Sequence, residues 1–285
     1  MIVITGASGQ LGRLVIESLL QKVPASQIVA AVREPQRVAD LAARGVQVRQ
    51  ADYEQPASLL RAFEGADKVL LISSNALGQR VAQHATVIDA ARQAGVKLLA
   101  YTSILHADTS PLPLAAEHKE TEVQIERSGL AHVFLRNGWY TENYLAGTAT
   151  AIQYSALFGS AGEGRIASAS RADYAEAAAV VLSRDVQPSA ILELAGDDSY
   201  TLSEFAAELA SHSGKPVAYR DLPEAEYKAA LLGAGLPEGI AALLAESDVG
   251  ASIGGLFDGA RQLSQLIGRP TTSWKAQVRT AVAAL

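Results

Sequence analysis

The chain has 285 residues, no cysteine, and a formal net charge of −6, from 24 Lys and Arg against 30 Asp and Glu. This length predicts one large domain, or one domain with a smaller lobe, and the absence of cysteine excludes disulfides and thiolate ligands and is typical of a cytoplasmic protein. An acidic chain without a long basic run is not expected to bind nucleic acid, and no apolar run reaches the roughly 18 residues of a membrane span.

The first predicted element is a strand over Ile2 to Ile4, which begins too early to leave room for a signal peptide. Three glycines follow at a spacing of three, and apolar residues from Leu11 to Leu19 then recur at helical spacing. A glycine-rich turn of this kind brings backbone N–H groups to a pyrophosphate, which the positive end of the helix attracts. We therefore predict a dinucleotide site, the alternative being a tight turn without a ligand. The residues expected to form it are Gly6, Ala7, Ser8, Gly9, Gln10, Leu11 and Gly12.

The second strand is predicted over Gln27 to Val32, and Arg33 follows it. In a dinucleotide fold this position, about 20 residues beyond the glycines, lies beside the adenosine ribose. An acidic side chain there would accept a hydrogen bond from the ribose of NAD, whereas a guanidinium suits a 2′-phosphate. Arg33 therefore favours NADPH, although Glu34 beside it is acidic. A solvated surface arginine is the alternative.

Strands and helices continue to alternate along the chain. Helices are predicted over residues 36–44, 56–63 and 79–93, and strands over residues 46–51, 68–72 and 97–101. The last of these strands is expected to end at Tyr101 and to open onto Thr102 and Ser103. This alternation with short connections predicts an α/β fold with a Rossmann-type doubly wound parallel sheet.

Polar residues follow two of the predicted strands. Asp52 and Tyr53 could line an adenine pocket, and Asp52 could equally cap the next turn. Ser73, Ser74 and Asn75 come at the carboxyl end of the strand over residues 68–72, where open α/β sheets place their ligands. We expect both groups to border the cofactor.

Several segments carry a narrower resemblance. The opening TGASGQLG, Arg33, Asp52-Tyr53, YTS at 101–103 and LRNGWYTENY at 135–144 together resemble the NmrA-like, atypical short-chain dehydrogenase/reductase family. Within that family, LHADTSPLPLA, RADYA and SDVGASIGGLFD are similar to the bacterial type-2 NAD(P)H:quinone oxidoreductases over nearly the whole chain. The resemblance implies NADPH as cofactor and a quinone as the small-molecule substrate.

The resemblance also implies where the nicotinamide lies. In that family the chain leaving the sixth strand, predicted here over residues 132–135, lies against the nicotinamide, and the arginine at 171 points to the same region. A strand end with an amide, a glycine and two aromatic residues also suits a flat ring, while a packed aromatic corner is the alternative. The residues so implied are Asn137, Gly138, Trp139, Tyr140, Thr141, Glu142 and Arg171.

One catalytic feature of ordinary short-chain dehydrogenases is missing. They pair a tyrosine with a lysine four residues later, and no such pair occurs between Ser103 and Arg127. His118 and Glu122 have this spacing instead, and one helical turn apart they could act as an acid/base pair. An exposed surface pair is the more common meaning of such spacing. His118 is thus the candidate catalytic residue, and chemistry on simple alcohols is not expected.

The alternating pattern weakens beyond Ser183. We therefore expect an NADP-binding Rossmann domain over residues 1–182 and a smaller C-terminal substrate lobe over residues 183–285, with an approximate boundary that the chain can cross back over. A short strand over residues 165–169 and an N-cap at Asp173, before an alanine-rich helix, are expected ahead of this boundary.

Beyond the boundary, an edge strand is expected over residues 190–194. Thr201 to Glu204 reads as a capping box that opens a helix through Ala210. The histidines stand at unrelated spacings, so no metal site is expected; those outside the candidate pair are His84, His106, His132 and His212.

These patterns favour an NADPH-dependent oxidoreductase that transfers hydride to a quinone. The cofactor carries the chemistry, and a quinone requires less from a protein acid than a simple ketone does. Two alternatives stay open: a redox sensor that binds the dinucleotide without turnover, and a reductase of a dye, an imine or another conjugated acceptor.

Overall fold

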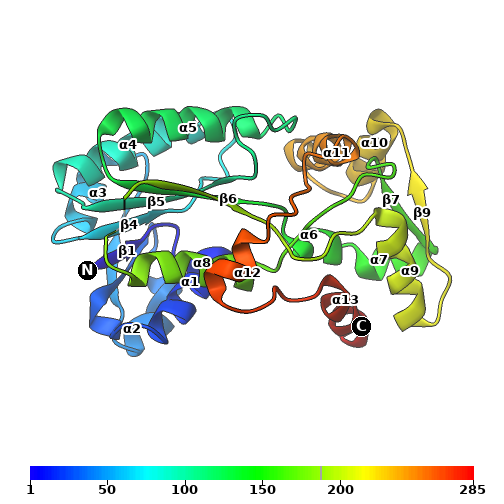
Figure 1. Ribbon diagram of the computed structural model, residues 1–285, viewed down its shortest axis with the longest axis horizontal. Helices are drawn as coiled ribbons and strands as arrows, with labels where there is room; N and C mark the ends of the chain where they lie inside the picture. Colours follow the sequence, from blue (N-terminus) through cyan, green and yellow to red (C-terminus); the bar gives the residue numbers. More distant parts are fainter. Residues whose placement is uncertain (187) are drawn as a thin grey trace. The chain divides into compact units, whose positions relative to one another are not determined.

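The computed structural model describes residues 1–186 and 188–285, and its first feature is a seven-stranded sheet (Figure 1). In spatial order its strands are β3 (Gln47–Gln50), β2 (Ile28–Val32), β1 (Ile2–Ile4), β4 (Lys68–Leu71), β5 (Leu98–Ile104), β6 (His132–Asn137) and β8 (Ala190–Leu194). The pairings from β3 through β6 are all parallel. The predicted Rossmann-type sheet is therefore confirmed, as is the edge strand over residues 190–194.

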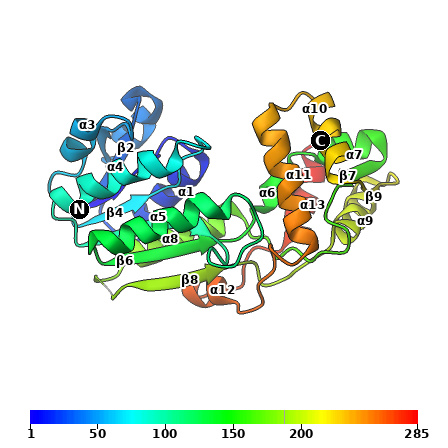
Figure 2. The ribbon, with the colours of Figure 1, turned by 90° about the horizontal axis from the view of Figure 1, so that it is seen from above.

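Helices cover both faces of this sheet (Figures 1 and 2). On one face lie α3 (Pro56–Ala62), α4 (Arg80–Gln93) and α5 (Ala115–Ser128). On the other lie α1 (Gln10–Leu20), α2 (Ala39–Ala43) and α8 (Arg171–Ser183). The central strands are buried on both sides, which is why they read as apolar runs.

One hydrophobic core fills the space between the sheet and the helices α3, α4 and α5. Val69 and Leu99 of the strands meet Leu59 of α3, Val87 of α4 and Ile125 of α5 there, all fully buried. Burial of each such side chain contributes roughly 1.5–3 kcal/mol. The core thereby fixes the strand ends that carry the candidate site.

Two predicted elements near the second strand differ in detail. A 3₁₀ turn, η1 (Ala25–Gln27), precedes β2. The helix expected over residues 36–44 is split into η2 (Pro35–Val38), a 3₁₀ turn, and α2. Val38 causes the break, because its side chain is fully buried and its backbone has φ −128° and ψ 27°, outside the helical range.

The strands β5 and β6 are longer than predicted. Their pairing continues through Ser103 opposite Arg136 to Ile104 opposite Asn137. Thr102 and Ser103 therefore lie inside β5 rather than beyond its end. The prediction stopped where the apolar run stopped, whereas these polar side chains are buried in the strand with hydrogen-bond partners.

The chain divides into two units, each described by itself. Unit 1 comprises residues 1–107, 117–137 and 171–193, and unit 2 comprises residues 108–116, 138–170 and 194–285. The chain crosses between the units several times. β6 and β8 are neighbours at one edge of the sheet in unit 1. Between them in the sequence, residues 138–170 belong to unit 2, and the chain returns to unit 1 at residue 171.

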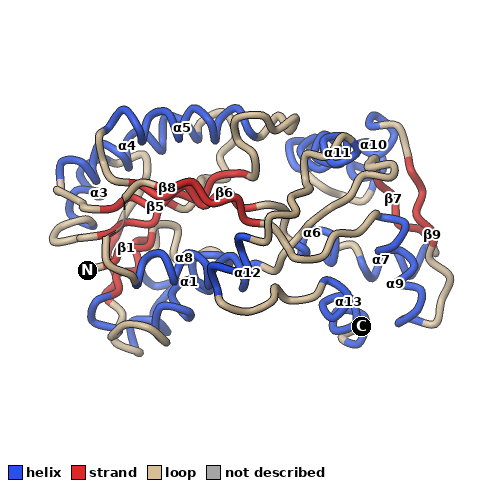
Figure 3. The backbone as a smooth tube through the Cα atoms, in the orientation of Figure 1, coloured by secondary structure: helices blue, strands red, loops and turns tan. Residues whose placement is uncertain are grey.

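Unit 2 contains a small parallel sheet of β7 (Ala156–Gly159) and β9 (Ala218–Asp221), visible in Figure 3. Its helices are α6 (Thr141–Leu145), α7 (Thr148–Tyr154), α9 (Leu202–Ser213), α10 (Glu224–Gly233), α11 (Glu238–Ser252), α12 (Gln262–Ile267) and α13 (Trp274–Ala283). The predicted capping box is confirmed: Glu204 N donates to Thr201 Oγ1 at 3.2 Å, and Thr201 N donates to Glu204 Oε2 at 2.9 Å.

Two other local predictions were wrong. Residues 165–169 form no strand, only isolated bridges from Ile166 to Tyr200 and from Tyr140 to Ala169. Asp173 is not an N-cap, because α8 already begins at Arg171 and the carboxylate lies within its first turn. A carboxylate in that position still favours the positive end of the helix. No helix among residues 1–186 and 188–285 is long and apolar enough to cross a bilayer.

Candidate functional site

The three glycines between β1 and α1 each meet a different backbone requirement. Gly6 has φ +59°, in the left-handed region that favours glycine. The N–H of Gly9 donates to the carbonyl of Gly6 at 3.0 Å, which closes the turn. A Cβ on Gly12 would lie 2.6 Å from that carbonyl oxygen and 2.8 Å from Cα of Ala7. The turn and the helix can approach this closely only because no side chain stands between them.

The N-terminus of α1 has the features of an anion-binding site. No side chain caps it and its first turn contains no acidic residue, so the first N–H groups of the helix are available to a ligand. Gly9, Gln10, Leu11 and Gly12 border a cavity of about 370 Å³. A phosphate group in this cavity would meet the positive end of the helix dipole.

The same cavity brings together most of the residues predicted to bind the cofactor. Those of the predicted residues that line it are Gly6, Ser8, Gly9, Gln10, Leu11, Gly12, Arg33, Asp52, Tyr53, Ser73, Ser74 and Asn75. Ala7 does not line it, because its side chain is fully buried. The cavity is also lined by residues that the sequence did not single out: Ala31, Val32, Ala51, Glu54, Ile72, Ala76 and Gln83.

Arg33 stands at the end of β2 on the cavity wall, with its side chain exposed. Its guanidinium has no hydrogen-bond or ion-pair partner in the described part of the chain, whereas Glu34 lies 3.6 Å from Nη1 of Arg37. The acidic neighbour is thus engaged elsewhere. An unpaired guanidinium at this strand end matches the chemistry of a 2′-phosphate.

Asp52 lies in the turn between β3 and α3 and does not cap that helix, whose N-cap is Gln55. Its carboxylate accepts from the N–H of Glu54 at 3.0 Å, and its own N–H donates to Ser58 Oγ at 2.9 Å. These bonds shape the turn that leads into α3. The residue also lines the cavity, so the turn holds it there.

Tyr53 closes the floor of the cavity beside the glycine turn. Its hydroxyl lies 2.5 Å from Thr5 Oγ1 and donates to the carbonyl of Ile72 at 2.9 Å. Burial raises the pKa of Tyr53 well above its usual value, and the hydroxyl therefore stays protonated. It connects the ends of β1 and β4 and takes no part in acid/base chemistry.

The carboxyl end of β6 carries an unsatisfied polar group. Asn137 is the last residue of the strand and is only 6 % exposed, and its Oδ1 has no hydrogen-bond partner among the described residues. A buried amide oxygen without a donor is costly unless a ligand or water supplies one. Because the strands are parallel, Asn137 lies at the same edge of the sheet as the residues that follow β1, β2 and β4.

The other residues implied for the nicotinamide belong to two units. Arg171 begins α8 in unit 1, while Gly138, Trp139, Tyr140, Thr141 and Glu142 lie in unit 2. Within unit 2, the N–H of Gly138 donates to the carbonyl of Leu194 at 2.7 Å, and Thr141 Oγ1 lies 2.8 Å from Ser168 Oγ. These bonds hold the two ends of the segment in a defined backbone path.

The expected pairing of His118 with Glu122 was wrong in both of its forms. His118 is 5 % exposed and its Nδ1 lies 2.7 Å from the hydroxyl of Tyr101. Glu122 instead accepts two hydrogen bonds from Arg136, at 2.9 and 2.6 Å, and one from Ser103 at 2.5 Å. Both side chains point into the protein, so they are neither a surface pair nor an acid/base pair.

The position of His118 also makes it a poor proton donor. Burial, with Arg80 and His84 as further causes, lowers its pKa well below the usual value. The imidazole is therefore neutral at physiological pH. It does not border the cavity of unit 1.

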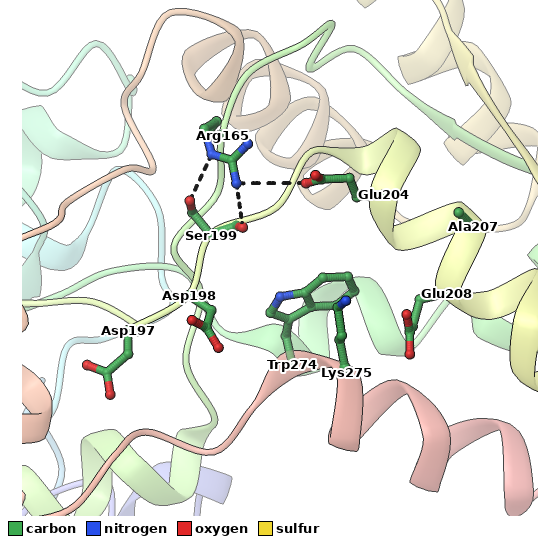
Figure 4. A pocket seen from close by; sticks show the side chains of 9 residues that line it. All are labelled: Arg165, Asp197, Asp198, Ser199, Glu204, Ala207, Glu208, Trp274 and Lys275. Atoms are coloured by element: carbon green, nitrogen blue, oxygen red, sulfur yellow. Dashed lines mark hydrogen bonds and ion pairs between the residues drawn. The ribbon is translucent and has the colours of Figure 1, made fainter.

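A second and larger hollow, of about 770 Å³, lies in unit 2 (Figure 4). Its lining residues are Arg165, Asp197, Asp198, Ser199, Glu204, Ala207, Glu208, Trp274 and Lys275. Four carboxylates face two basic side chains there, and Arg165 is already bonded to Ser199 at 2.8 and 2.7 Å. This excess of negative charge would repel a dinucleotide, whereas the smaller cavity offers the start of α1 and Arg33.

Comparisons with known proteins agree with this geometry. Residues 6–185 match the NAD(P)H-binding family. The chain is 58 % identical to quinone oxidoreductase 2 of Escherichia coli strain K12 over 273 residues, 96 % of either protein. The crystal structure of NADPH-dependent quinone oxidoreductase QOR2 from E. coli, complexed with NADPH, matches with a TM-score of 0.96 at 57 % identity, covering 98 % of this chain and 99 % of that one.

A reductase with a different acceptor in its name is also similar to this chain. The triphenylmethane reductase of Citrobacter sp., complexed with NADP(H), matches with a TM-score of 0.95 at 39 % identity, covering 99 % of this chain and all of that one. These matches confirm the family resemblance drawn from the sequence. The chain belongs to the NAD(P)H-binding family.

Proposed function

We propose that this protein is an NADPH-dependent oxidoreductase that reduces quinones. The observation that carries the proposal is the cavity at the strand ends, where an uncapped helix start and an unpaired Arg33 face the same space. The similarity to a quinone oxidoreductase over 96 % of the chain gives the acceptor. The protein has no cysteine, and we place its activity in the cytoplasm, where disulfides are rare.

Different residues of unit 1 would bind different parts of the cofactor. The N–H groups from Gly9 to Gly12 would hold the pyrophosphate, and Arg33 the 2′-phosphate. Asp52 and the loop from Ser73 to Asn75 would border the adenosine. Two independent features support this fit: the helix start that no side chain caps, and the unpaired guanidinium of Arg33 on the cavity wall.

We assign the nicotinamide end to the residues around the end of β6. The unpartnered Oδ1 of Asn137 can accept a hydrogen bond from the carboxamide N–H₂ of the ring. Arg171, in the same unit as Asn137, is a further residue that the family resemblance implies for this end of the cofactor. Bound NADPH supplies a hydride, and the quinone takes up that hydride and one proton to become a hydroquinone.

This chemistry makes small demands on protein acids. The helix α5 contains no tyrosine, and the buried His118 is not available as a donor. The protein's contribution is to hold two flat rings close together and in register, an effect that can account for several kcal/mol of a barrier. Solvent can supply the proton, because the developing charge is spread over the acceptor ring and its oxygens.

A steady-state assay tests the proposal. Purified protein is mixed with NADPH and a small benzoquinone, and loss of the reduced nicotinamide absorbance is followed with and without protein. We expect one NADPH consumed per quinone reduced, and no reaction with simple secondary alcohols and NADP⁺. Failure of every quinone to accelerate NADPH oxidation would remove the proposal.

The Citrobacter relative favours a second acceptor class, triphenylmethane dyes. The same cavity and the same hydride would serve, because such a dye also delocalises the incoming electron pair. A dye reduced with a higher kcat/KM than any quinone would make this the main activity.

A further inference from the structure

All three polar groups of Ser74 are bonded to side chains of a single helix. Ser74 lies in the loop that follows β4 and lines the cofactor cavity. Its N–H donates to His84 Nε2 at 2.9 Å, its carbonyl accepts from Arg80 Nε at 2.7 Å, and its hydroxyl donates to Gln83 Oε1 at 2.5 Å. Residues 80, 83 and 84 lie on one face at the start of α4. We call these three side chains the α4 clamp.

The α4 clamp is itself held from behind by α5. His84 Nδ1 lies 3.0 Å from Thr121 Oγ1, and that hydroxyl donates to the carbonyl of Glu117 at 2.8 Å. Arg80 Nη1 donates to the carboxylate of Glu117 at 3.2 Å. Since Thr121 uses its hydrogen for Glu117, it accepts from His84, which assigns the proton to Nδ1 and leaves Nε2 free to accept from Ser74.

Burial separates His84 and Arg80 from any ligand. His84 is 0 % exposed, Arg80 is 5 % exposed, and neither lines the cavity. Burial, with Arg80 as a lesser cause, lowers the pKa of His84 to about 3. The imidazole therefore stays neutral and keeps its acceptor nitrogen across the range in which the protein would work.

We propose that Arg80, Gln83 and His84 are positioning residues that hold the loop of Ser73 to Ala76 in the shape that receives the dinucleotide. The inference rests on the NADPH-binding half of the proposed function and is independent of the acceptor. The apparent dissociation constant of a ligand rises in inverse proportion to the fraction of protein in the competent conformation. By keeping that fraction near one, the clamp raises cofactor affinity although His84 and Arg80 touch no cofactor atom.

Gln83 adds a link across the cavity rim. Its Nε2 donates to Glu54 Oε1 at 3.0 Å, and both residues line the cavity. The clamp thus connects the loop after β4 with the loop after β3. Because Gln83 borders the ligand space itself, the decisive variants are at His84.

The test compares NADPH binding in three variants of the full chain. His84→Leu removes the acceptor for Ser74, and we expect the Kd of NADPH to rise about tenfold, as for a loop competent roughly a tenth of the time. His84→Gln places an amide oxygen near the position of Nε2 and is expected to stay within about threefold of the parent by the same relation. Val87→Ala, a core change on the same helix without a bond to Ser74, controls for lost stability and should leave Kd unchanged.

Turnover separates positioning from a general structural effect. At saturating NADPH, His84→Leu should keep kcat within about twofold, because the loop is then in place. If His84→Leu does not fold, Thr121→Val tests the inference in its place. This variant removes the hydroxyl that fixes the tautomer of His84, and it should raise the Kd of NADPH severalfold. Parent-like NADPH affinity in folded His84→Leu or Thr121→Val, or an equal loss of affinity in Val87→Ala, would overturn the inference. A protein that binds NADPH but reduces no quinone would instead contradict the proposed function alone.

Discussion

The carboxylate of Glu34 lies 3.6 Å from the guanidinium of Arg37, so the acidic residue at the end of β2 is paired with the arginine three residues on. Arg33, its immediate neighbour, keeps an unpaired guanidinium on the wall of the cavity. Arg33 favours NADPH and Glu34 would favour NADH at this position. Because Glu34 is paired with Arg37, Arg33 is the residue expected to select the cofactor. The positive group faces the cofactor space.

Arg33→Ala should therefore erode the preference for NADPH. A hydrogen bond to a charged group contributes about 1.5–3 kcal/mol, which is roughly ten- to a hundredfold in Kd for NADPH, with little change for NADH. Arg61→Ala removes an exposed arginine outside the cavity and is the charge-matched control. Titration of both proteins with both cofactors measures the effect. Equal Kd values for NADPH and NADH in the parent protein would refute the assignment.

Gly12→Ala should damage both the fold and the cofactor site. The added methyl group would lie 2.6 Å from the carbonyl oxygen of Gly6, and neither backbone can move without opening the turn. Overpacking of this kind costs on the order of 1–3 kcal/mol, and here it also displaces the N–H groups of the helix start. Urea unfolding and NADPH titration should both report the loss.

Gly239→Ala provides the matched control, because nothing lies within 4 Å of its added Cβ and the residue is in the exposed first turns of α11. We expect that variant to be as stable as the parent or slightly more stable. Similar behaviour of the two variants would show that the close approach at Gly12 is unimportant.

Glu122→Ala should be strongly destabilising. The carboxylate is 4 % exposed and holds Arg136, which is 4 % exposed as well. Removing one partner of a buried pair costs about 3–5 kcal/mol, and we expect the lower end because Glu193 still contacts Arg136 at 2.9 Å. Glu120→Ala, an exposed change on the same helix, should stay within about 0.5 kcal/mol. Comparable midpoints of urea unfolding for the two variants would contradict the buried pairing.

These side chains illustrate how far the sequence could predict the molecule. A strand buried on both faces is an apolar run, so β1 could be read directly, and so could the capping box at Thr201. The helical spacing of His118 and Glu122 was also read correctly. Their partners, Tyr101 and Arg136, come from neighbouring strands, and no local pattern states which strand residue a buried side chain will meet.

The division into two units was harder to predict from the sequence, because it also depends on contacts between residues far apart in the chain. The segment over residues 138–170 follows β6 without a break in composition, yet it belongs to unit 2. Which unit a helix joins depends on long-range packing, as in the contact of Tyr144 with Asp248, 104 positions apart. The cofactor loop was predictable because its function requires glycines at fixed positions. The α4 clamp could not be predicted, because His84 and Arg80 contact Ser74 and do not line the cavity themselves.

Asp248 predicts a pH dependence of stability within unit 2. Its buried carboxylate accepts from Tyr144 Oη at 2.9 Å and from Ser160 N at 3.0 Å, and burial raises its pKa to about 6. The titratable groups that influence it are Tyr144, Tyr200, Tyr219, Tyr227 and Asp221, with no basic side chain among them.

Between pH 4 and 6 the folded state holds a proton that the unfolded state has released, so this group's contribution to stability falls as pH rises and is constant above about pH 6. Two pKa units correspond to roughly 3 kcal/mol. Asp248→Asn cannot titrate, and its stability relative to the parent should rise by up to that amount from pH 4 to pH 7. Urea unfolding of both proteins at several pH values measures the difference. A constant difference across this range would contradict the raised pKa.

The central claim, reduction of a quinone by bound NADPH, is tested most directly in a single turnover. The protein is mixed with less than one equivalent of NADPH, so that nearly all of the nicotinamide is bound, and a small benzoquinone is then added in a stopped-flow instrument. We predict that the bound nicotinamide is oxidised far faster than the same NADPH without protein, with one hydroquinone formed per NADPH lost. If NADPH binds tightly and stays reduced in the presence of every quinone and dye tried, the protein is a dinucleotide sensor and not a reductase.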